Sequence, residues 1–185
     1  TSKGHLKRKL GKYDEALVCF EKTLAIQKDY YFNDNNKEIG TSYNNIGTVY
    51  HSKGEFAKAL DNNYKSLEIR VKVLPENHQD IAVSYNNIGS VYESIGEYVK
   101  AIENHNKSLE IFKKNLPGNH PIIAKIYNNI GLVYKAEGKY DQALENHKKS
   151  LKILKKALPK NHPNIAASYN NIALVFTAKG EYEKA

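Results

Sequence analysis

Residues 85–92 read Tyr-Asn-Asn-Ile-Gly-Ser-Val-Tyr, and versions of this octet also begin at Tyr43, Tyr127 and Tyr169. The four leading tyrosines are 42 residues apart. A fixed period of this size indicates one supersecondary unit stacked repeatedly on itself. In and around the octet, apolar or small residues recur every three or four positions, as on one face of an α-helix. The sequence therefore predicts an array of helical repeats.

The composition is that of a soluble folded protein, with 41% hydrophobic and 26% charged residues. No run of residues approaches the roughly 18 apolar residues of a membrane span, and the first residues lack the apolar core of a signal peptide. Cys19 is the only cysteine, so an intrachain disulfide is excluded. This usage favours a reducing compartment, and we expect a cytoplasmic protein with no membrane partner.

The net charge of +8 raises the question of an acidic partner or a nucleic acid. The lysines of the region 148–156, however, alternate with the expected core positions Leu151 and Leu158. That pattern is typical of lysines that keep outer helix faces solvated. Nucleic-acid binding through the basic surface is therefore the less favoured interpretation of the charge.

The repeats divide the chain into a single array: a partial repeat at 1–36, full repeats at 37–78, 79–120 and 121–162, and a partial repeat at 163–185. In each, a first helix should end near a glycine that permits a left-handed backbone, namely Gly54, Gly96 or Gly138. A second, longer helix should end at a Leu-Pro pair, whose prolines are Pro75, Pro117 and Pro159. Because both ends cut through repeats, we expect a fragment of a longer protein.

Each full repeat ends with an Asn-His pair, at 77–78, 119–120 and 161–162. We expect the asparagine to cap the next helix. The histidines, one repeat apart, are too distant from each other to share a metal ion with bonds near 2 Å. Residues 1–10 have a poor apolar pattern, and fraying is expected there.

The motif Tyr-x2-Ile-Gly-x2-Tyr, followed by Gly-x-Tyr-x2-Ala and a closing proline, resembles the tetratricopeptide repeat. The Asn-Asn-Ile-Gly and Leu-Pro-x-Asn-His-Pro elements are similar to the 42-residue variety found in kinesin light chains. The resemblance covers nearly the whole chain. It implies an all-α, right-handed superhelical solenoid of antiparallel helix pairs, with the first helices lining the concave side.

Helical geometry places one set of residues from each first helix in the groove. These residues lie on the side of the helix opposite the apolar face that packs in the core. The central member of each set is the second asparagine of the pair, namely Asn45, Asn87, Asn129 or Asn171. The other candidate groove residues are Thr41, Thr48, Val83, Ser90, Ser94, Lys125, Leu132 and Leu174. The first asparagines should lie at the flank, where they could bond between neighbouring repeats.

A carboxamide offers both a donor and an acceptor, so it can bind the backbone of an extended peptide whatever its sequence. In kinesin light chains the matching asparagines contact cargo peptides, as the resemblance implies. Asparagine could instead be merely tolerated on a wet helix face, or duplication could have copied it without selection for binding. Four repeated pairs are not explained by helix propensity, because asparagine is a mediocre helix former.

The sequence carries no phosphate-binding loop, paired catalytic carboxylates or Ser-His-Asp arrangement, so no enzyme activity, metal or other cofactor is expected. We expect an interaction scaffold that binds an extended peptide or partner segment of unknown identity in its groove. The alternative is a sensor or regulatory array attached to an effector, such as a signalling ATPase or protease, that this chain lacks. Broken repeats at both ends also predict head-to-tail self-association.

Overall fold

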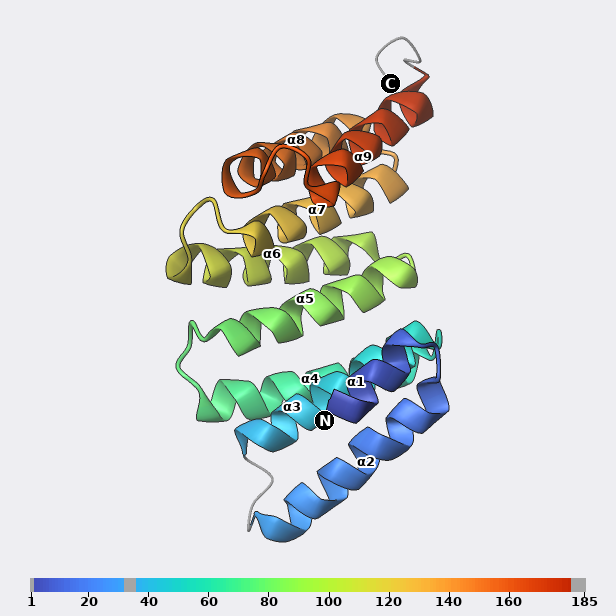
Figure 1. Cartoon of the computed structure of the whole chain (residues 1–185), viewed down its shortest axis with the longest axis vertical. Helices are drawn as coiled ribbons and strands as arrows, with labels where there is room; N and C mark the ends of the chain where they lie inside the picture. Colours follow the sequence, from blue (N-terminus) through green and yellow to red (C-terminus); the bar gives the residue numbers. More distant parts are fainter. Residues whose placement is uncertain (1, 32–35, 181–185) are drawn as a thin grey trace. The chain divides into compact units, whose positions relative to one another are not determined.

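The structure, a computed structural model, describes residues 2–31 and 36–180. Every regular element in these two ranges is an α-helix (Figure 1). The chain divides into two compact units, Thr1–Ile95 and Gly96–Ala185, and each is described by itself below. The boundary falls between the two helices of the expected repeat 79–120.

The first unit contains the helices α1 (Ser2–Lys9), α2 (Tyr13–Tyr30), α3 (Lys37–Ser52), α4 (Phe56–Val73) and α5 (Gln79–Ser94). Each helix packs against the next one along the chain, and α3 also touches α5. Successive helices of this unit run antiparallel (Figure 1). Apolar and small buried residues recur at the same place in successive repeats, as predicted, and the polar side chains of Asn63 and Arg70 are buried with them.

The second unit contains α6 (Tyr98–Asn115), α7 (Pro121–Ala136), α8 (Tyr140–Ala157) and α9 (Pro163–Lys179). Here too each helix packs on its successor, and α7 and α8 share the largest interface. The predicted all-α architecture of tetratricopeptide-type helix pairs is confirmed in both units. No helix of residues 2–31 and 36–180 combines the length and the apolar character that a bilayer crossing demands.

Glycine and proline end the helices where the sequence predicts. Gly54, Gly96 and Gly138 have φ angles of 76°, 82° and 80°, in the left-handed region that other residues rarely adopt. The helices α4, α6 and α8 end one residue before a leucine that precedes proline. The second helices have 18 residues and the first helices α3, α5 and α7 have 16, so the predicted difference in length is confirmed.

The N-terminal caps differ from the prediction. The histidine, and not the asparagine before it, caps each helix: Nδ1 of His78, His120 and His162 accepts a bond from the backbone N–H two residues on, at 3.1–3.2 Å. Asn36 takes this place before α3, where its Oδ1 accepts from the N–H of Glu38 at 2.9 Å. An imidazole nitrogen can accept as a carboxamide oxygen does, so the structure explains these histidines without a metal.

The expected fraying of residues 1–10 is wrong for most of that segment, because Ser2–Lys9 form α1. Gly4 faces the ring of Phe20 on α2 so closely that a Cβ would lie 2.7 Å from the Cζ of that ring. His5 packs its ring against Phe20 edge to face, with centroids 5.2 Å apart. One close contact therefore compensates for the weak apolar pattern of α1.

Small residues allow the same close approach deeper in the array. Ala143 and Ser150 of α8 are buried, as are their counterparts one and two repeats earlier. Gly131 of α7 lies over the ring of His147, and a Cβ at position 131 would come within 2.8 Å of the ring. Gly131 is therefore required by the packing of α7 against α8, the second helix of the same repeat.

The leading tyrosines lie at the edge of the core, half-buried or more exposed, rather than inside it as the helical pattern predicts. The ring of Tyr127 is flanked by the ammonium groups of Lys113 and Lys149, at 5.2 and 5.7 Å from its centroid. Tyr43 lies between Lys28 and Lys65 in the same way, at 5.7 and 5.8 Å. Part of the lysine excess therefore covers tyrosine faces through cation–π contacts.

Candidate functional site

The second unit contains a pocket of about 460 Å³ between α7, α8 and α9. Its apolar lining comes from Pro121, Ile122, Leu154 and Ala167. Its polar lining comes from Lys125 and Asn128 of α7, Ser150 of α8, and Asn164, Ser168 and Asn171 of α9. A pocket of mixed lining and this size, built on three packed helices, is typical of a preformed binding site.

A pair of carboxamides forms one side of the pocket. Asn171 Nδ2 donates to Asn128 Oδ1 at 2.8 Å, which joins the second asparagine of one repeat to the first asparagine of the repeat before it. The same oxygen lies 3.1 Å from His147 Nδ1. Because a carboxamide oxygen can only accept, Nδ1 carries the proton and donates. The Asn128 side chain is thus fixed from both sides.

This arrangement leaves hydrogen-bonding capacity for a ligand. Within the described residues, no further bond is formed by the Asn171 oxygen or the Asn128 amide group. These atoms offer an acceptor and donors next to each other, which is what the C=O and N–H groups of an extended peptide require. The buried hydroxyl of Ser150 likewise has no partner among the described residues.

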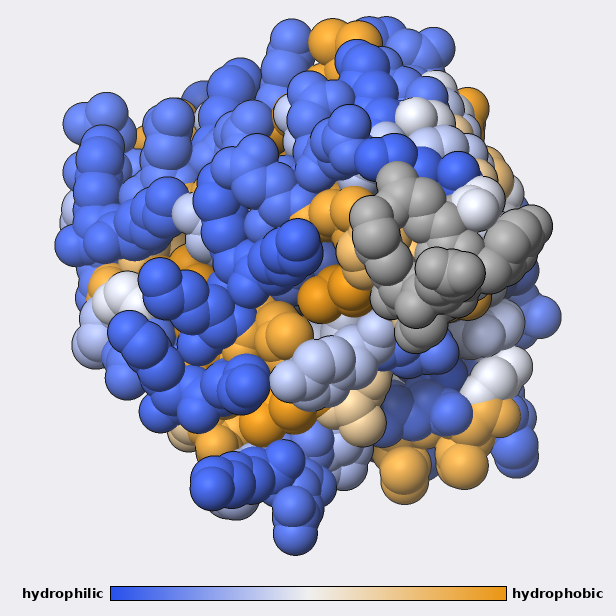
Figure 2. Space-filling model, turned by 90° about the horizontal axis from the view of Figure 1, so that it is seen from above, coloured by the Kyte–Doolittle hydropathy of each residue, from blue (hydrophilic) through white to orange (hydrophobic). Residues whose placement is uncertain are grey.

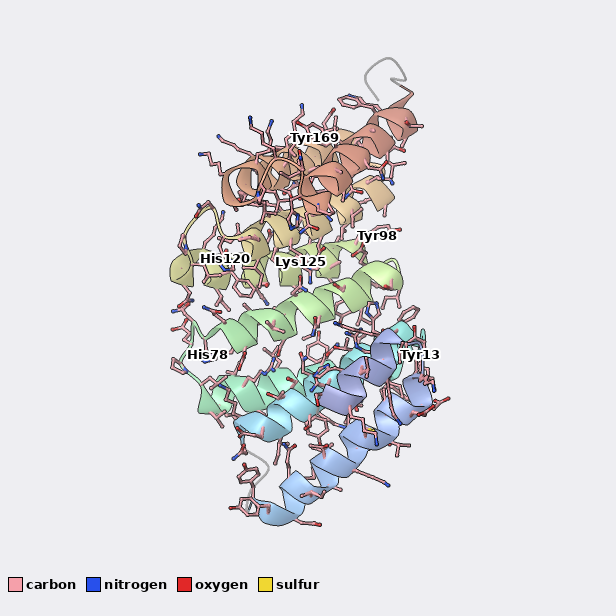
Figure 3. The ribbon with its side chains drawn as sticks, viewed as in Figure 1. Tyr13, His78, Tyr98, His120, Lys125 and Tyr169 are labelled. Carbon is pink, nitrogen blue, oxygen red and sulfur yellow. The ribbon has the colours of Figure 1, made fainter. Side chains whose placement is uncertain are left out.

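Lys125 is the one charged residue of the pocket lining. It lies on α7 beyond the capping His120 (Figure 3), is exposed, and makes no ion pair with any described residue. Burial lowers the pKa of His147 to about 4, and the charge of Lys135 adds to the effect. His147 is therefore neutral at neutral pH, and the electrostatic character of the pocket is set by Lys125.

The first unit repeats the asparagine pair. Asn87 Nδ2 donates to Asn44 Oδ1 at 2.9 Å, so the expectation that first asparagines bond between repeats holds for Asn44 and Asn128. Thr48 bonds back to the carbonyl of Asn44, and Ser94 bonds to that of Ser90 and to the ring of His51. These hydroxyls are thus used within the protein.

The structure brings two of the predicted groove residues, Lys125 and Asn171, together in the pocket. Ser94 and Leu174 are exposed, and the remaining predicted residues are half-buried: Thr41, Asn45, Thr48, Val83, Asn87, Asn129, Ser90 and Leu132. Asn45 differs from Asn87 and Asn171 in having no hydrogen-bond partner among the described residues.

Several residues of the pocket are absent from the sequence prediction, above all Leu154, Asn164 and Ser168. Leu154 lies on a second helix, whereas the predicted groove consists of first-helix residues alone. The sequence does contain a sign that this second-helix position is special. The equivalent positions 70, 112 and 154 hold arginine, phenylalanine and leucine, although the surrounding residues repeat closely. In residues 2–31 and 36–180 there is no cluster of three or more His, Cys, Asp or Glu side chains suited to a metal ion.

Solved structures with the same fold include proteins of the kinesin-light-chain kind. BtubC (BKLC) from P. vanneervenii has a TM-score of 0.84 at 21% identity, over 98% of this chain and 72% of that one. A putative kinesin light chain from Podosopora anserina, described as having nearly identical TPR-like repeats, has a TM-score of 0.82 at 22% identity, over 99% and 86%. A Rap protein complexed with Competence and Sporulation Factor has a TM-score of 0.80 at 17% identity, over 99% and 49%.

A search of curated proteins found no match to the sequence. The tetratricopeptide-repeat family, in contrast, matches at residues 1–71, 38–114 and 122–185, which together cover almost the entire chain. These matches agree with the helix pairs, the closing glycines and the 42-residue period. The chain therefore belongs to the tetratricopeptide-repeat family and is an array of the kinesin-light-chain-like kind.

Proposed function

We propose that this protein is a non-enzymatic interaction scaffold that binds an extended peptide segment of a partner protein along its first helices. The observation that carries the proposal is the pocket between α7, α8 and α9, with the Asn128–Asn171 pair at its side. The pair presents an acceptor and donors to a peptide backbone, and the adjacent cavity has room for a side chain. Backbone and side chain of one segment could thus be bound together.

The family supports this proposal in general terms, because tetratricopeptide repeats are scaffolds for protein–protein interaction. One of the similar structures is, by its description, a complex of a Rap protein with Competence and Sporulation Factor. We infer that the present chain also engages a protein or peptide ligand. The identity of that ligand does not follow from the resemblance of folds.

The proposal is tested by selecting random linear peptides on the immobilised chain and measuring their affinity for variants. Asn171→Ala should weaken the selected peptides by about tenfold, since it removes a ligand contact and releases Asn128. Asn170→Ala is the matched control, because Asn170 is the exposed neighbour of Asn171 and does not line the pocket. Equal affinity of both variants, or failure to select any peptide, would contradict the proposal.

Salt dependence distinguishes this function from nucleic-acid binding. A ligand at the pocket meets one lysine, so its affinity should fall only modestly between low and moderate salt. Contacts with six or more phosphates would instead reduce affinity by roughly a thousandfold or more over a similar range. A steep salt dependence would therefore favour the basic surface over the pocket.

We further propose self-association through exposed apolar residues at α2 and α9. Val18 and Ile26 are exposed on α2, as are Tyr169 and Leu174 on α9. A second molecule that covers these four apolar side chains removes them from water, which lowers the free energy of the associated state. The proposal follows the head-to-tail expectation from the sequence.

A further inference from the structure

Three second-helix positions, one period apart, differ in the size and charge of their side chains. They hold Arg70 in α4, Phe112 in α6 and Leu154 in α8. All three side chains are buried. Leu154 lines the pocket of the second unit, and Arg70 occupies the equivalent place two periods earlier in the first unit.

Arg70 shows what this place can hold. Its side chain is only 3% exposed, and Nη1 donates to the carbonyl oxygen of Asp80 at 2.8 Å and to Ser84 Oγ at 2.9 Å. Asp80 and Ser84 belong to α5, the first helix of the next repeat. The guanidinium of the protein itself therefore fills the space between α4 and α5.

The same two acceptors are present in the second unit without a guanidinium. Asn164 and Ser168 stand where Asp80 and Ser84 stand in the first unit. Ser168 Oγ bonds to the Asn164 carbonyl at 2.9 Å, as Ser84 Oγ bonds to the Asp80 carbonyl at 3.3 Å. Leu154 is too short to reach these acceptors and has no donor for them, unlike Arg70. Asn164 and Ser168, which carry the two acceptors, both line the open pocket.

The charges around the two places have opposite sign. Positions equivalent to the pocket lining carry Lys37, Glu38 and Asp80 in the first unit, a net negative charge if Arg70 itself is left aside. Asp80 also forms an ion pair with Lys37 at 3.7 Å. The pocket of the second unit carries only Lys125. A cation is therefore stabilised at the Arg70 site of the first unit and repelled from the pocket of the second unit.

We propose that the side chain at the equivalent positions 70, 112 and 154 acts as a plug, which closes the site where the side chain is large and leaves it open where it is Leu154. The site left open by Leu154 is a specificity pocket for one uncharged side chain with an N–H or O–H donor at its end. Glutamine and tyrosine side chains have this chemistry, with an apolar stem for Leu154 and Ile122 and a donor for Asn164 and Ser168. An arginine side chain, which satisfies the same acceptors in the first unit, is rejected here because of Lys125. The proposal rests on the peptide-binding function and specifies which residue of the peptide enters the pocket.

The test uses N-acetyl amides of glutamine, tyrosine and arginine as probes of the whole chain, with the methyl signal of Leu154 observed by NMR. The glutamine and tyrosine probes should shift this signal, and the arginine probe should bind at least about tenfold more weakly. Equal binding of the arginine probe would overturn the assignment of an uncharged ligand. So would the absence of any response to the glutamine and tyrosine probes.

Plugging variants test the role of position 154. Leu154→Phe introduces the residue native at position 112, and Leu154→Arg the residue native at position 70. Both should abolish probe binding, as observed on the Ile122 methyl signal, whereas Leu154→Met should preserve it. Thermal melting identifies a variant that does not fold. If Leu154→Arg does not fold, Leu154→Phe alone tests the role of position 154. Unchanged probe binding in a folded Leu154→Phe variant would overturn the proposal.

The reverse exchange provides the complementary test. Arg70→Leu should open the first-unit site, and its negative lining should then bind the arginine probe in preference to the glutamine probe. A preference for glutamine there would overturn the charge argument. Peptides selected on the wild-type chain distinguish the role of position 154 from the proposed function. Peptide binding that survives Leu154→Phe contradicts only the role of position 154. Failure to select any peptide contradicts the proposed function itself.

Discussion

At the level of single residues, the asparagine pairs join neighbouring repeats. Asn87 and Asn171 are half-buried, and each donates to the first asparagine of the preceding repeat. They therefore connect repeats, and this role is separate from the contact with a ligand that we propose for Asn171. This explains the recurrence of a mediocre helix former at the same place better than mere tolerance on a wet surface does.

Asn87→Ala should lower the free energy of unfolding by about 1 kcal/mol, because the half-buried oxygen of Asn44 loses its donor. Asn45→Ala is the matched control, since Asn45 is also half-buried but bonds to no described residue. Urea denaturation of both variants measures the difference. Equal stability of the two variants would show that the bond between repeats contributes nothing.

The stability of the second unit should depend on pH through its buried histidines. Burial lowers the pKa of His105 and of His147 to about 4, from the ordinary value of 6.5. Between pH 6.5 and 4 the unfolded chain binds the protons and the folded chain does not, so stability is fully present above pH 6.5 and is lost as the pH falls toward 4. The loss should amount to about 2–3 kcal/mol for each histidine.

His147→Asn isolates this effect from the titration of carboxylates. Asparagine is the residue native at the equivalent position 63 and does not titrate. The stability of wild type relative to the variant should decrease from pH 7 to pH 4.5, as followed by thermal melting. A difference that stays constant over this range would mean that His147 does not remain neutral when folded.

At the scale of the helix, the caps show where sequence reasoning succeeded and where it failed. Glycine and proline ended the helices as predicted, because their effect on the backbone depends on few neighbours. The sequence predicts that Asn119 and its counterparts cap the helices, whereas in the structure the histidines do so. Both side chains can accept a hydrogen bond, and only the backbone direction at the connector decides between them.

His120→Ala should destabilise the chain by about 0.5–2 kcal/mol, because the backbone N–H of Ile122 in α7 loses its acceptor. His120→Asn should retain most of the stability, since Asn36 caps α3 in this way. Asn119→Ala should have a smaller effect than His120→Ala. Thermal melts of the three variants provide the comparison, and a larger loss for Asn119→Ala would refute the assignment of the cap.

The pocket could not be predicted from the helical pattern for a related reason. Periodicity places Lys125 and Asn171 on one side of their helices, and both do line the pocket. It cannot show that Leu154 leaves a cavity, because that depends on volume and on the acceptors of the next helix. The same limit applies to the tyrosines, whose apolar rings fit a core stripe but lie at its edge under lysines.

At the scale of the whole chain, the exposed apolar residues bear on self-association. Viewed from the α8–α9 end, the surface shows hydrophobic residues gathered in a band between hydrophilic ones (Figure 2). On α9, Tyr169 is 50% exposed and Leu174 is 43% exposed. Their counterparts Tyr127 and Leu132 on α7 are half-buried, since α7 packs against helices on both sides.

We expect the chain to associate with rising concentration, with the apolar face of α9 on one molecule meeting that of α2 on another. A heterologous contact of this kind joins two different surfaces, so it need not close and can continue into longer oligomers. Sedimentation velocity over a wide concentration range should show a weight-average sedimentation coefficient that increases steadily. Leu174→Lys and Ile26→Lys should each keep the chain monomeric, because either substitution places a charge in the same interface. Since each variant retains one intact surface, a mixture of the two should form dimers but no longer oligomers. Association that survives both substitutions, or a wild-type chain that stays monomeric throughout, would show that these faces do not bind each other.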